Sequence, residues 1–426
     1  MSRATSSGIA FSSVGSRLRP PAITGLMQAA LEDPKILSLA AGFTDSSSLP
    51  VEAVGRAVRR LEQKPGPPEH LQYGTNQGRP GLRRLLAEFV GGHDGSTVGS
   101  IDPDSVIITN GSQQALYLAS RVLCEPGDIV LVERPSYFVY LDMLKGLGVD
   151  IRSLPESPDG RIDSDGLTSF LDRCRRDGSA DRIKIVYIEG YFSNPAGVCR
   201  TNDEKREIAE ALNASTANPV VIEDAAYRDL YFHHPHPGDS ILALSGFESI
   251  PCLYLGTLTK PFATGMKVGF GICSHHDWRQ RILWLKSHQD FGTANFNQAI
   301  LEEIVLDGGL EEQTTRLRKN YLGKMEALHE AMIAEGLDSM GWKWTKPQGG
   351  LYFWLQAPVG LDTRMDSHFW QACRDEHVLY IPGDLCYGND APNDRVRLSF
   401  GVLKPDDLAR AAARFARASR RIVVPA

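Results

Sequence analysis

A lysine in a loop rich in glycine and hydroxyl side chains carries the strongest chemical signal in the sequence. Lys260 lies in the segment 256–270, which reads GTLTKPFATGMKVGF and follows the apolar run 253–255. The end of a strand delivers such a residue into a loop, where a scaffold places reactive groups. A lysine amine can hold an aldehyde as a Schiff base and exchange it for another amine. Most lysines in loops are solvated surface charges, so a chemical role for Lys260 requires suitable polar groups in other segments of the chain.

Three other segments supply the polar groups that a reactive lysine needs. Gly111-Ser112-Gln113 stands between an expected strand and an expected helix, where free backbone amides favour a phosphate. Asn194 precedes Pro195, and Asp224 closely follows the apolar run 220–222. Each segment alone is ordinary, since serine and aspartate cap helices and Asn-Pro begins turns. Together with Lys260 they favour a site for pyridoxal phosphate, which carries both an aldehyde and a phosphate.

Composition favours a small-molecule substrate. The chain has 426 residues and a net charge of -6, which gives no electrostatic reason to bind nucleic acid or a membrane surface. The seven cysteines form no CxxC pair, and an odd number argues against a closed disulfide framework. The sequence contains no run of about eighteen apolar residues. We therefore expect a protein of a reducing compartment, the cytoplasm.

The elements that must position these groups alternate between strands and helices. Short apolar runs predict strands at 106–109, 129–132, 151–154, 183–188, 220–222, 253–255 and 268–272. Helical spacing at 113–123, 137–147, 166–175 and 203–212 separates most of them. This alternation predicts an α/β fold with a mainly parallel sheet covered on both faces, whose site lies at the carboxyl ends of strands.

The pattern of short strands and helices ends at about residue 290, and long helices are expected at 295–307 and 311–335. Strands at 350–355, 378–381 and 395–400 and helices at 365–374 and 405–420 follow, which predicts a smaller α+β domain. We expect an N-terminal arm that forms part of the small domain at 1–49, a large cofactor-binding domain at 50–305 and the rest of the small domain at 306–426.

These motifs occur in the order found in one enzyme family. From about residue 40 to the C-terminus, the chain resembles the fold type I, class I/II pyridoxal-phosphate aminotransferases, and within them the branch of 2-aminoadipate and kynurenine aminotransferases. The resemblance implies a seven-stranded, mainly parallel sheet in the large domain. It also implies that the protein moves the amino group of an L-amino acid to a 2-oxo acid by a ping-pong route, through a Lys260 Schiff base.

The resemblance also implies roles for individual residues. Those assigned to the cofactor are Ser112, Gln113, Thr257, Thr259 and Lys267 near the phosphate, Tyr137 on the ring face, Asn194 and Tyr227 at the phenolic oxygen, Asp224 at the ring nitrogen, Lys260 as the Schiff-base lysine, and Tyr73 from the neighbouring subunit of a homodimer. Lys260, Asp224 and Tyr137 form the implied catalytic set. Arg397, Gly42 and Asn194 are implied to bind the substrate, and no metal is expected.

Two positions depart from the family pattern. Ala196 replaces the usual threonine after Asn194-Pro195, which leaves the asparagine in place. Lys267 stands where the family usually has an arginine that forks onto the phosphate. Lysine keeps the charge but loses the bidentate geometry, so the cofactor would be held less tightly unless other donors compensate.

Other interpretations remain open at this point. The same cofactor supports elimination, cyclisation, decarboxylation or oxidation of an amino acid in specialised metabolism. A ligand-sensing module of a transcription regulator is a further alternative, although the chain is acidic and shows no helix-turn-helix extension before residue 21. The cluster His233-His234-Pro235-His236 suggests a metal, but it lacks the i, i+4 spacing of helical ligands.

Overall fold

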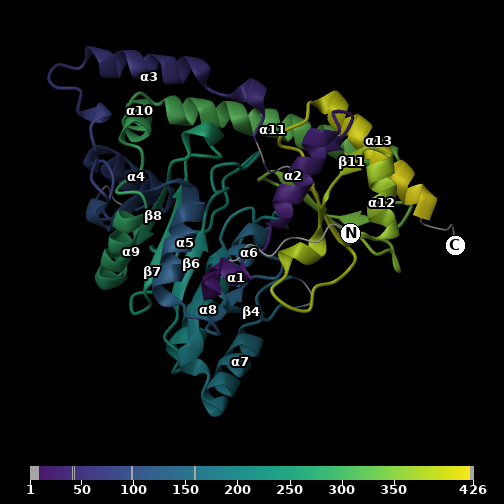
Figure 1. Ribbon diagram of the computed structural model, residues 1–426, viewed down its shortest axis with the longest axis horizontal. Coiled ribbons are helices and arrows are strands. Elements are labelled where there is room, and N and C mark those ends of the chain that lie inside the picture. The colour runs from purple at the N-terminus through teal and green to yellow at the C-terminus, as the bar shows by residue number, and fades with distance from the viewer. Residues whose placement is uncertain (1–8, 41, 43, 97–98, 158–159, 423–426) are drawn as a thin grey trace.

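A seven-stranded sheet forms the centre of the computed structural model, which describes residues 9–40, 42, 44–96, 99–157 and 160–422 (Figure 1). Its strands are β2 (Val106–Thr109), β3 (Ile129–Val132), β4 (Asp150–Ser153), β5 (Ile183–Glu189), β6 (Val220–Asp224), β7 (Cys252–Thr257) and β8 (Gly269–Cys273). They lie in the order β2-β8-β7-β6-β5-β3-β4. Only the pairs that involve β8 are antiparallel. The prediction of a mainly parallel seven-stranded sheet is confirmed.

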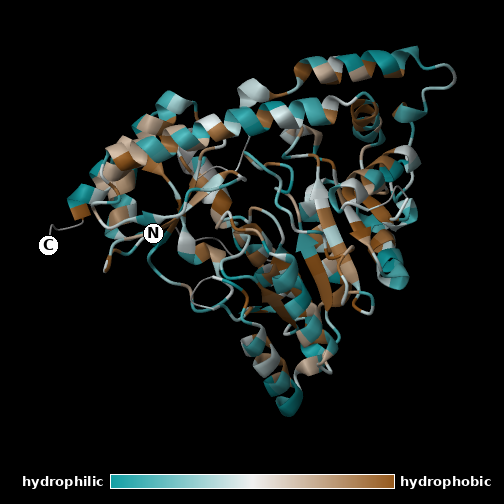
Figure 2. Ribbon diagram, turned by 180° about the vertical axis from the view of Figure 1, so that it is seen from behind, coloured by the Kyte–Doolittle hydropathy of each residue, from teal (hydrophilic) through white to brown (hydrophobic). Residues whose placement is uncertain are grey.

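Helices cover both faces of this sheet, because side chains alternate along each strand. On β5, Ile185 and Tyr187 pack with residues of α5 (Gly111–Leu123), α6 (Phe138–Leu147) and α9 (His276–Gln289). Val186 and Ile188 pack on the opposite side with residues of α7 (Ser164–Asp177) and α8 (Asn202–Asn213). Figure 2 shows the hydrophobic strands enclosed between these helices. Strands buried on both sides give continuous apolar runs, which is why the sequence located them.

The remaining helices before residue 307 lie at the edge of the sheet and at the N-terminus. They are α1 (Ser13–Arg17), α2 (Ala22–Glu32), α3 (Val51–Gln63), α4 (Pro80–His93) and α10 (Asn295–Leu306). Helix α10 packs against both α3 and α4. Helix α9 is absent from the sequence prediction, because its buried Trp278, Ile282 and Leu283 stand among arginine, lysine and histidine residues that weaken the apolar pattern.

A second, smaller group of elements lies beyond the long helix α11 (Gly309–Ala334), which runs in Figure 1 from near α10 towards α13 (Pro405–Ile422). An antiparallel sheet has the order β12-β13-β10-β9, and its strands are β9 (Lys343–Trp344), β10 (Tyr352–Gln356), β12 (Ile381–Pro382) and β13 (Arg395–Ser399). Strand β1 (Leu37–Ser38) pairs in parallel with β11 (Val378–Leu379). Residues near the N-terminus thus pair with residues near the C-terminus.

Two sequence predictions in this region need correction. The single strand expected at 378–381 is two strands, because β11 pairs with β1 while β12 pairs with β13 in the other sheet. The helix expected to begin at residue 365 begins later, as α12 (His368–Asp375), because the Ser367 side chain accepts a hydrogen bond from the Trp370 amide and caps it there. None of the described helices is long and apolar enough to cross a membrane.

Candidate active site

A cavity of about 570 Å³ lies where strands β5, β6 and β7 of the large sheet end. Twelve of the thirteen residues assigned from the sequence line it: Gly42, Ser112, Gln113, Tyr137, Asn194, Asp224, Tyr227, Thr257, Thr259, Lys260, Lys267 and Arg397. Asp224 ends β6 and Thr257 ends β7, so parallel strands bring them to one edge, whereas Arg397 comes from β13. The structure therefore gathers residues that are up to 355 positions apart (397 minus 42).

Lys260 presents its amine inside this cavity. Its Nζ donates a hydrogen bond to the Gly42 carbonyl oxygen at 2.7 Å and lies 5.9 Å from the centre of the Tyr227 ring. Burial lowers the pKa of Lys260, and the positive charges of Arg397 and Lys267 act in the same direction. A lower pKa increases the neutral fraction of the amine, which is the nucleophilic form.

Asp224 is a buried carboxyl group with two hydrogen-bond donors. The Tyr187 hydroxyl donates to its Oδ2 at 3.1 Å, and the Ala226 backbone amide donates to its Oδ1 at 3.0 Å. Burial dominates over both donors and raises the pKa of Asp224 to about 6. A carboxylate in such a place is suited to hold a proton on a ring nitrogen that would otherwise lose it.

The N-terminus of α5 and the loop around Lys260 form an anion-binding wall. Gly269 lies so close to this helix start that a Cβ atom would be 2.5 Å from the Gly111 carbonyl carbon and 2.6 Å from the Ser112 nitrogen. The Thr259 hydroxyl is buried without a hydrogen-bond partner among the described residues. Lys267 adds a positive charge and follows the short 3-10 helix Thr264–Met266. Free amides, an unpaired hydroxyl and a lysine are donors that fit a phosphate.

Arg397 lines the same cavity and is held by two hydrogen bonds. It is 1% exposed, and its guanidinium donates to Asn194 Oδ1 and to the Ala40 carbonyl oxygen, both at 2.7 Å. The guanidinium also lies 4.2 Å from the centre of the Tyr352 ring. Its Nε is buried without a partner among the described residues. A planar cation held in this way is suited to a carboxylate.

Tyr352 is a site residue that the sequence analysis missed. It lines the cavity from β10, and its hydroxyl forms a 2.8 Å hydrogen bond with that of Tyr227. A Cβ atom on Gly42 would lie 2.8 Å from the same hydroxyl, so glycine leaves room for it. Tyr352 follows Gly349-Gly350, but a tyrosine inside an apolar strand looks like any core residue, and only the pairing of β10 with β13 brings it to Arg397.

Tyr73 is the one assigned residue that lies outside the cavity. Its side chain is 81% exposed and packs edge to face on Phe291, which is 63% exposed, at 5.8 Å between ring centres. Two large exposed rings in contact form an apolar surface that remains uncovered in a single chain.

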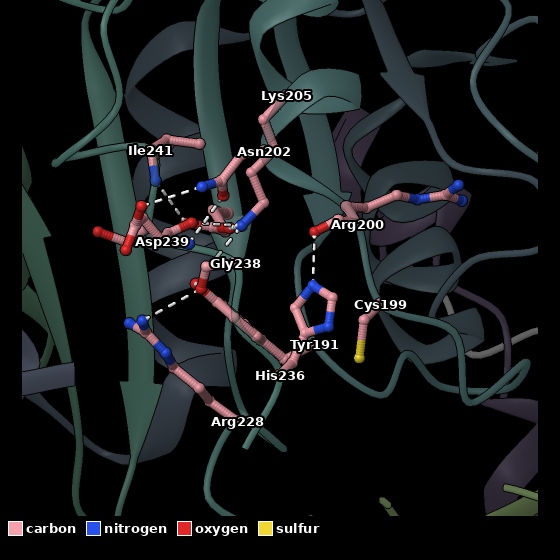
Figure 3. A network of polar contacts seen from close by, with 12 residues as sticks. Tyr191, Cys199, Arg200, Asn202, Lys205, Arg228, His236, Gly238, Asp239 and Ile241 are labelled. Carbon is pink, nitrogen blue, oxygen red and sulfur yellow. Dashed lines mark hydrogen bonds and ion pairs between the residues drawn. The ribbon is translucent and has the colours of Figure 1, made fainter. Parts of the chain in front are cut away.

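The histidine cluster does not form a metal site with other described residues. No group of three or more His, Cys, Asp or Glu side chains among them is arranged to hold a metal ion. His236 instead forms a 3.0 Å hydrogen bond through Nε2 with the Arg200 carbonyl oxygen (Figure 3). Burial lowers its pKa.

The residues present fit pyridoxal phosphate. The anion-binding wall, the buried carboxyl of Asp224 and the amine of Lys260 open into one cavity, as a phosphate, a ring nitrogen and an aldehyde require. The donors that fit the phosphate include an unpaired buried hydroxyl, that of Thr259.

Comparisons with known proteins agree with this chemistry. The family described as aminotransferase class I and II matches residues 34–415. The 2-aminoadipate transaminase of Thermus thermophilus is 28% identical over 97% of each chain. Aromatic-amino-acid aminotransferase 1 of Thermococcus litoralis is 29% identical over 91% of this chain and 88% of its own. The solved kynurenine aminotransferase of Pyrococcus horikoshii, in complex with PMP, superposes with a TM-score of 0.87 at 28% identity, over 97% of this chain and 98% of the other.

These relatives confirm the predicted resemblance and favour transamination over the alternative reactions of the same cofactor. They also confirm the predicted fold class, since the kynurenine enzyme matches nearly the whole chain. The chain therefore belongs to the class I and II aminotransferases, and it is a pyridoxal-phosphate-dependent enzyme that transfers amino groups between amino acids and 2-oxo acids.

Proposed function

We propose that Lys260 binds the cofactor covalently and then moves the proton that transamination requires. The observation that carries this proposal is that the Lys260 amine opens into the same cavity as Asp224, Asn194 and Arg397. Pyridoxal phosphate supplies an aldehyde that takes up the amino group and a ring that withdraws electrons from the substrate α-carbon. The lowered pKa of Lys260 suits both tasks, because the neutral amine attacks the aldehyde and accepts a proton.

Other residues hold the two ends of the cofactor in this proposal. Ser112, Gln113, Thr257, Thr259 and Lys267 bind the phosphate, and Asp224 keeps a proton on the ring nitrogen. Tyr137 covers one face of the ring. Asn194 and Tyr227 donate hydrogen bonds to the phenolic oxygen. This assignment is supported by their shared cavity and by the unpaired Thr259 hydroxyl.

Arg397 binds the α-carboxylate of the amino acid or 2-oxo acid, with Gly42 and Asn194 beside it. The described charged residues that line the cavity are Glu189, Asp224, Lys260, Lys267 and Arg397. Each of these charged residues except Glu189 binds the cofactor or the substrate in this proposal. The apolar residues Pro21, Ile23, Phe138 and Val139 also line the cavity. This apolar wall supports an amino donor with an uncharged side chain.

We further propose that the protein is a cytoplasmic homodimer of amino acid biosynthesis, in which Tyr73 reaches the phosphate of the neighbouring site. The exposed Tyr73 and Phe291 rings support a covered surface, and all seven cysteines are free, as in a reducing compartment. Within each subunit, we propose an arm and part of the small domain at 1–49, a large domain at 50–305 and the rest of the small domain at 306–426. The pairing of β1 with β11 supports this grouping.

The role of Lys260 can be tested by chemical trapping. Borohydride reduction of the holoenzyme, followed by peptide mass mapping, should leave a pyridoxyl group on Lys260 and on no other lysine. Lys260→Ala should lose both the label and the absorption band of the lysine-bound cofactor. A Lys260→Ala protein that kept this band would show that another residue holds the cofactor.

The substrate class can be tested with the same absorption band. Leucine, methionine and phenylalanine should convert the bound cofactor to its amine form faster than glutamate, 2-aminoadipate or lysine does. A preference for an acidic or basic donor would mean that a charged group from elsewhere enters the site.

A further inference from the structure

Glu189 lines the cofactor cavity without a role in the proposed function. It ends β5, is 4% exposed, and stands in register with Asp224 at the end of the neighbouring strand β6. Neighbouring strands lie about 4.8 Å apart, so the two carboxyl groups begin from adjacent positions at one sheet edge. Two carboxylates so close together cannot both ionise without a large electrostatic cost.

The contacts of Glu189 are those of a hydrogen-bonding group rather than of a counter-ion. Its Oε2 accepts a hydrogen bond from the Asn194 backbone amide at 2.7 Å. Its Oε1 is buried without a hydrogen-bond partner, and no Lys or Arg among the described residues forms an ion pair with it.

Other buried glutamates nearby do have cationic partners. Glu133 lies 3.0 Å from Arg200 Nε, and Glu223 lies 2.6 Å from Lys205 Nζ. Figure 3 shows Lys205 in a polar network with Asn202 and Asp239. Both of these buried glutamates therefore have a cationic partner, whereas Glu189 forms no ion pair with a lysine or arginine among the described residues.

The surroundings of Glu189 favour its protonated form. Burial raises its pKa well above the ordinary value, and the charges of Asp224 and Glu133 add to this rise. The backbone amides of Asn194 and Tyr137 oppose it. A buried carboxyl group without a cation loses less solvation free energy when it is neutral.

We propose that Glu189 is a positioning residue that works as a neutral carboxylic acid: it holds the Asn194 backbone in place and leaves Asp224 as the only anion of the pair. The Asn194 side chain accepts the 2.7 Å hydrogen bond of Arg397, so the position of Asn194 also sets that of the guanidinium. This inference rests on the proposed function, which assigns Asn194 to the cofactor and Arg397 to the substrate.

The substitution Glu189→Gln distinguishes a neutral acid from a carboxylate. A glutamine carbonyl can accept the Asn194 amide hydrogen bond, and glutamine cannot ionise. We expect Glu189→Gln to keep the cofactor dissociation constant and the KM for amino donor and 2-oxo acid within about twofold of the wild type, because it loses no hydrogen bond. Glu189→Ala should raise both KM values about tenfold, with a smaller change in kcat, because the Asn194 amide is left unpaired.

The protonation state can also be measured directly in the holoenzyme. The infrared difference spectrum between wild type and Glu189→Gln should contain the carbonyl stretch of a protonated carboxylic acid. A difference spectrum with carboxylate bands only would overturn the inference, as would a Gln variant impaired as strongly as Ala. Wild-type KM values in Glu189→Ala would overturn the positioning role. If the Ala variant does not fold, the infrared band and the KM values of the Gln variant still show whether Glu189 is protonated.

Glu133→Gln is a matched control, because Glu133 is equally buried and ion-paired with Arg200. It should lower the Tm, since it leaves the buried guanidinium with less compensating charge, whereas Glu189→Gln should not. Borohydride mapping of Lys260 on the same wild-type sample separates the two proposals. An unlabelled Lys260 would refute the proposed function, whereas the infrared band reports on Glu189 alone.

Discussion

Replacing Asp224 with asparagine should stabilise the cofactor-free protein while it removes the group proposed to protonate the cofactor ring. Burial raises the pKa of Asp224 from 3.8 to about 6. A carboxyl group whose pKa is higher in the folded state stabilises the fold most when it is protonated. Its contribution is therefore fully present at low pH and is lost as the pH rises to about 6.

The magnitude follows from the two pKa values. At about 1.4 kcal/mol per pKa unit, ionised Asp224 costs the cofactor-free fold about 3 kcal/mol at pH 8. At pH 5 the carboxyl group is mostly protonated in the folded state, and the cost is about 1.6 kcal/mol. Asparagine keeps an oxygen that accepts from the Ala226 amide, and its NH2 group can donate to the Tyr187 hydroxyl oxygen, which reverses the direction of that hydrogen bond but keeps the contact without the charge.

The assay is the difference in denaturation midpoint between cofactor-free wild type and Asp224→Asn across this pH range. The variant should be more stable at pH 8, and its advantage should fall by about half at pH 5. Titrating groups that do not interact with Asp224 cancel in this difference because both proteins share them. A variant no more stable than wild type at pH 8, or an advantage independent of pH, would refute the assignment of the raised pKa to Asp224.

Three further substitutions test other parts of the site. Arg397→Lys should lower kcat/KM by about 10- to 100-fold, since a fork of charge-assisted hydrogen bonds becomes a point contact, and should leave cofactor affinity unchanged in equilibrium dialysis. Lys267→Arg should tighten cofactor binding about fivefold by restoring bidentate geometry; the same or weaker affinity would mean that other donors already compensate. Tyr73→Ala should weaken cofactor binding in equilibrium dialysis, because the proposed homodimer brings this side chain to the phosphate of the neighbouring site. Unchanged affinity in Tyr73→Ala would argue against a shared site.

The sequence predicted the large sheet well because its strands are short and apolar. The strands at Val106–Thr109 and Ile129–Val132 agree with the expected bounds at both ends. The small domain was harder, since Val378 to Pro382 serves two sheets in turn and no local pattern marks the change. Helix α9 was missed because polar and charged residues interrupt the spacing of its buried Trp278, Ile282 and Leu283.

The order of the motifs along the chain predicted the site residues that lie next to a glycine, a proline or the end of a strand. Twelve of them line the cavity, which no spacing rule alone would have gathered, and their roles remain predictions. Tyr352 escaped because it begins an apolar strand and looks like a core residue in sequence, and Glu189 escaped because it ends β5 and belongs to none of the motifs. Their place in the site depends on strand pairing, β10 with β13 and β5 with β6, which is a tertiary property.

Burial acts in opposite directions on the two groups at the centre of this site. It lowers the pKa of Lys260 and raises that of Asp224, because low polarity disfavours any charge. The lysine benefits, since its neutral amine is the reactive form. The aspartate does not benefit, because its charge at neutral pH destabilises the cofactor-free fold. A cationic ring beside Asp224 would offset this destabilisation. The buried cavity that lowers the pKa of Lys260 therefore also favours the binding of a cation beside Asp224. A second anion at Glu189 would increase the electrostatic cost of leaving Asp224 without such a cation.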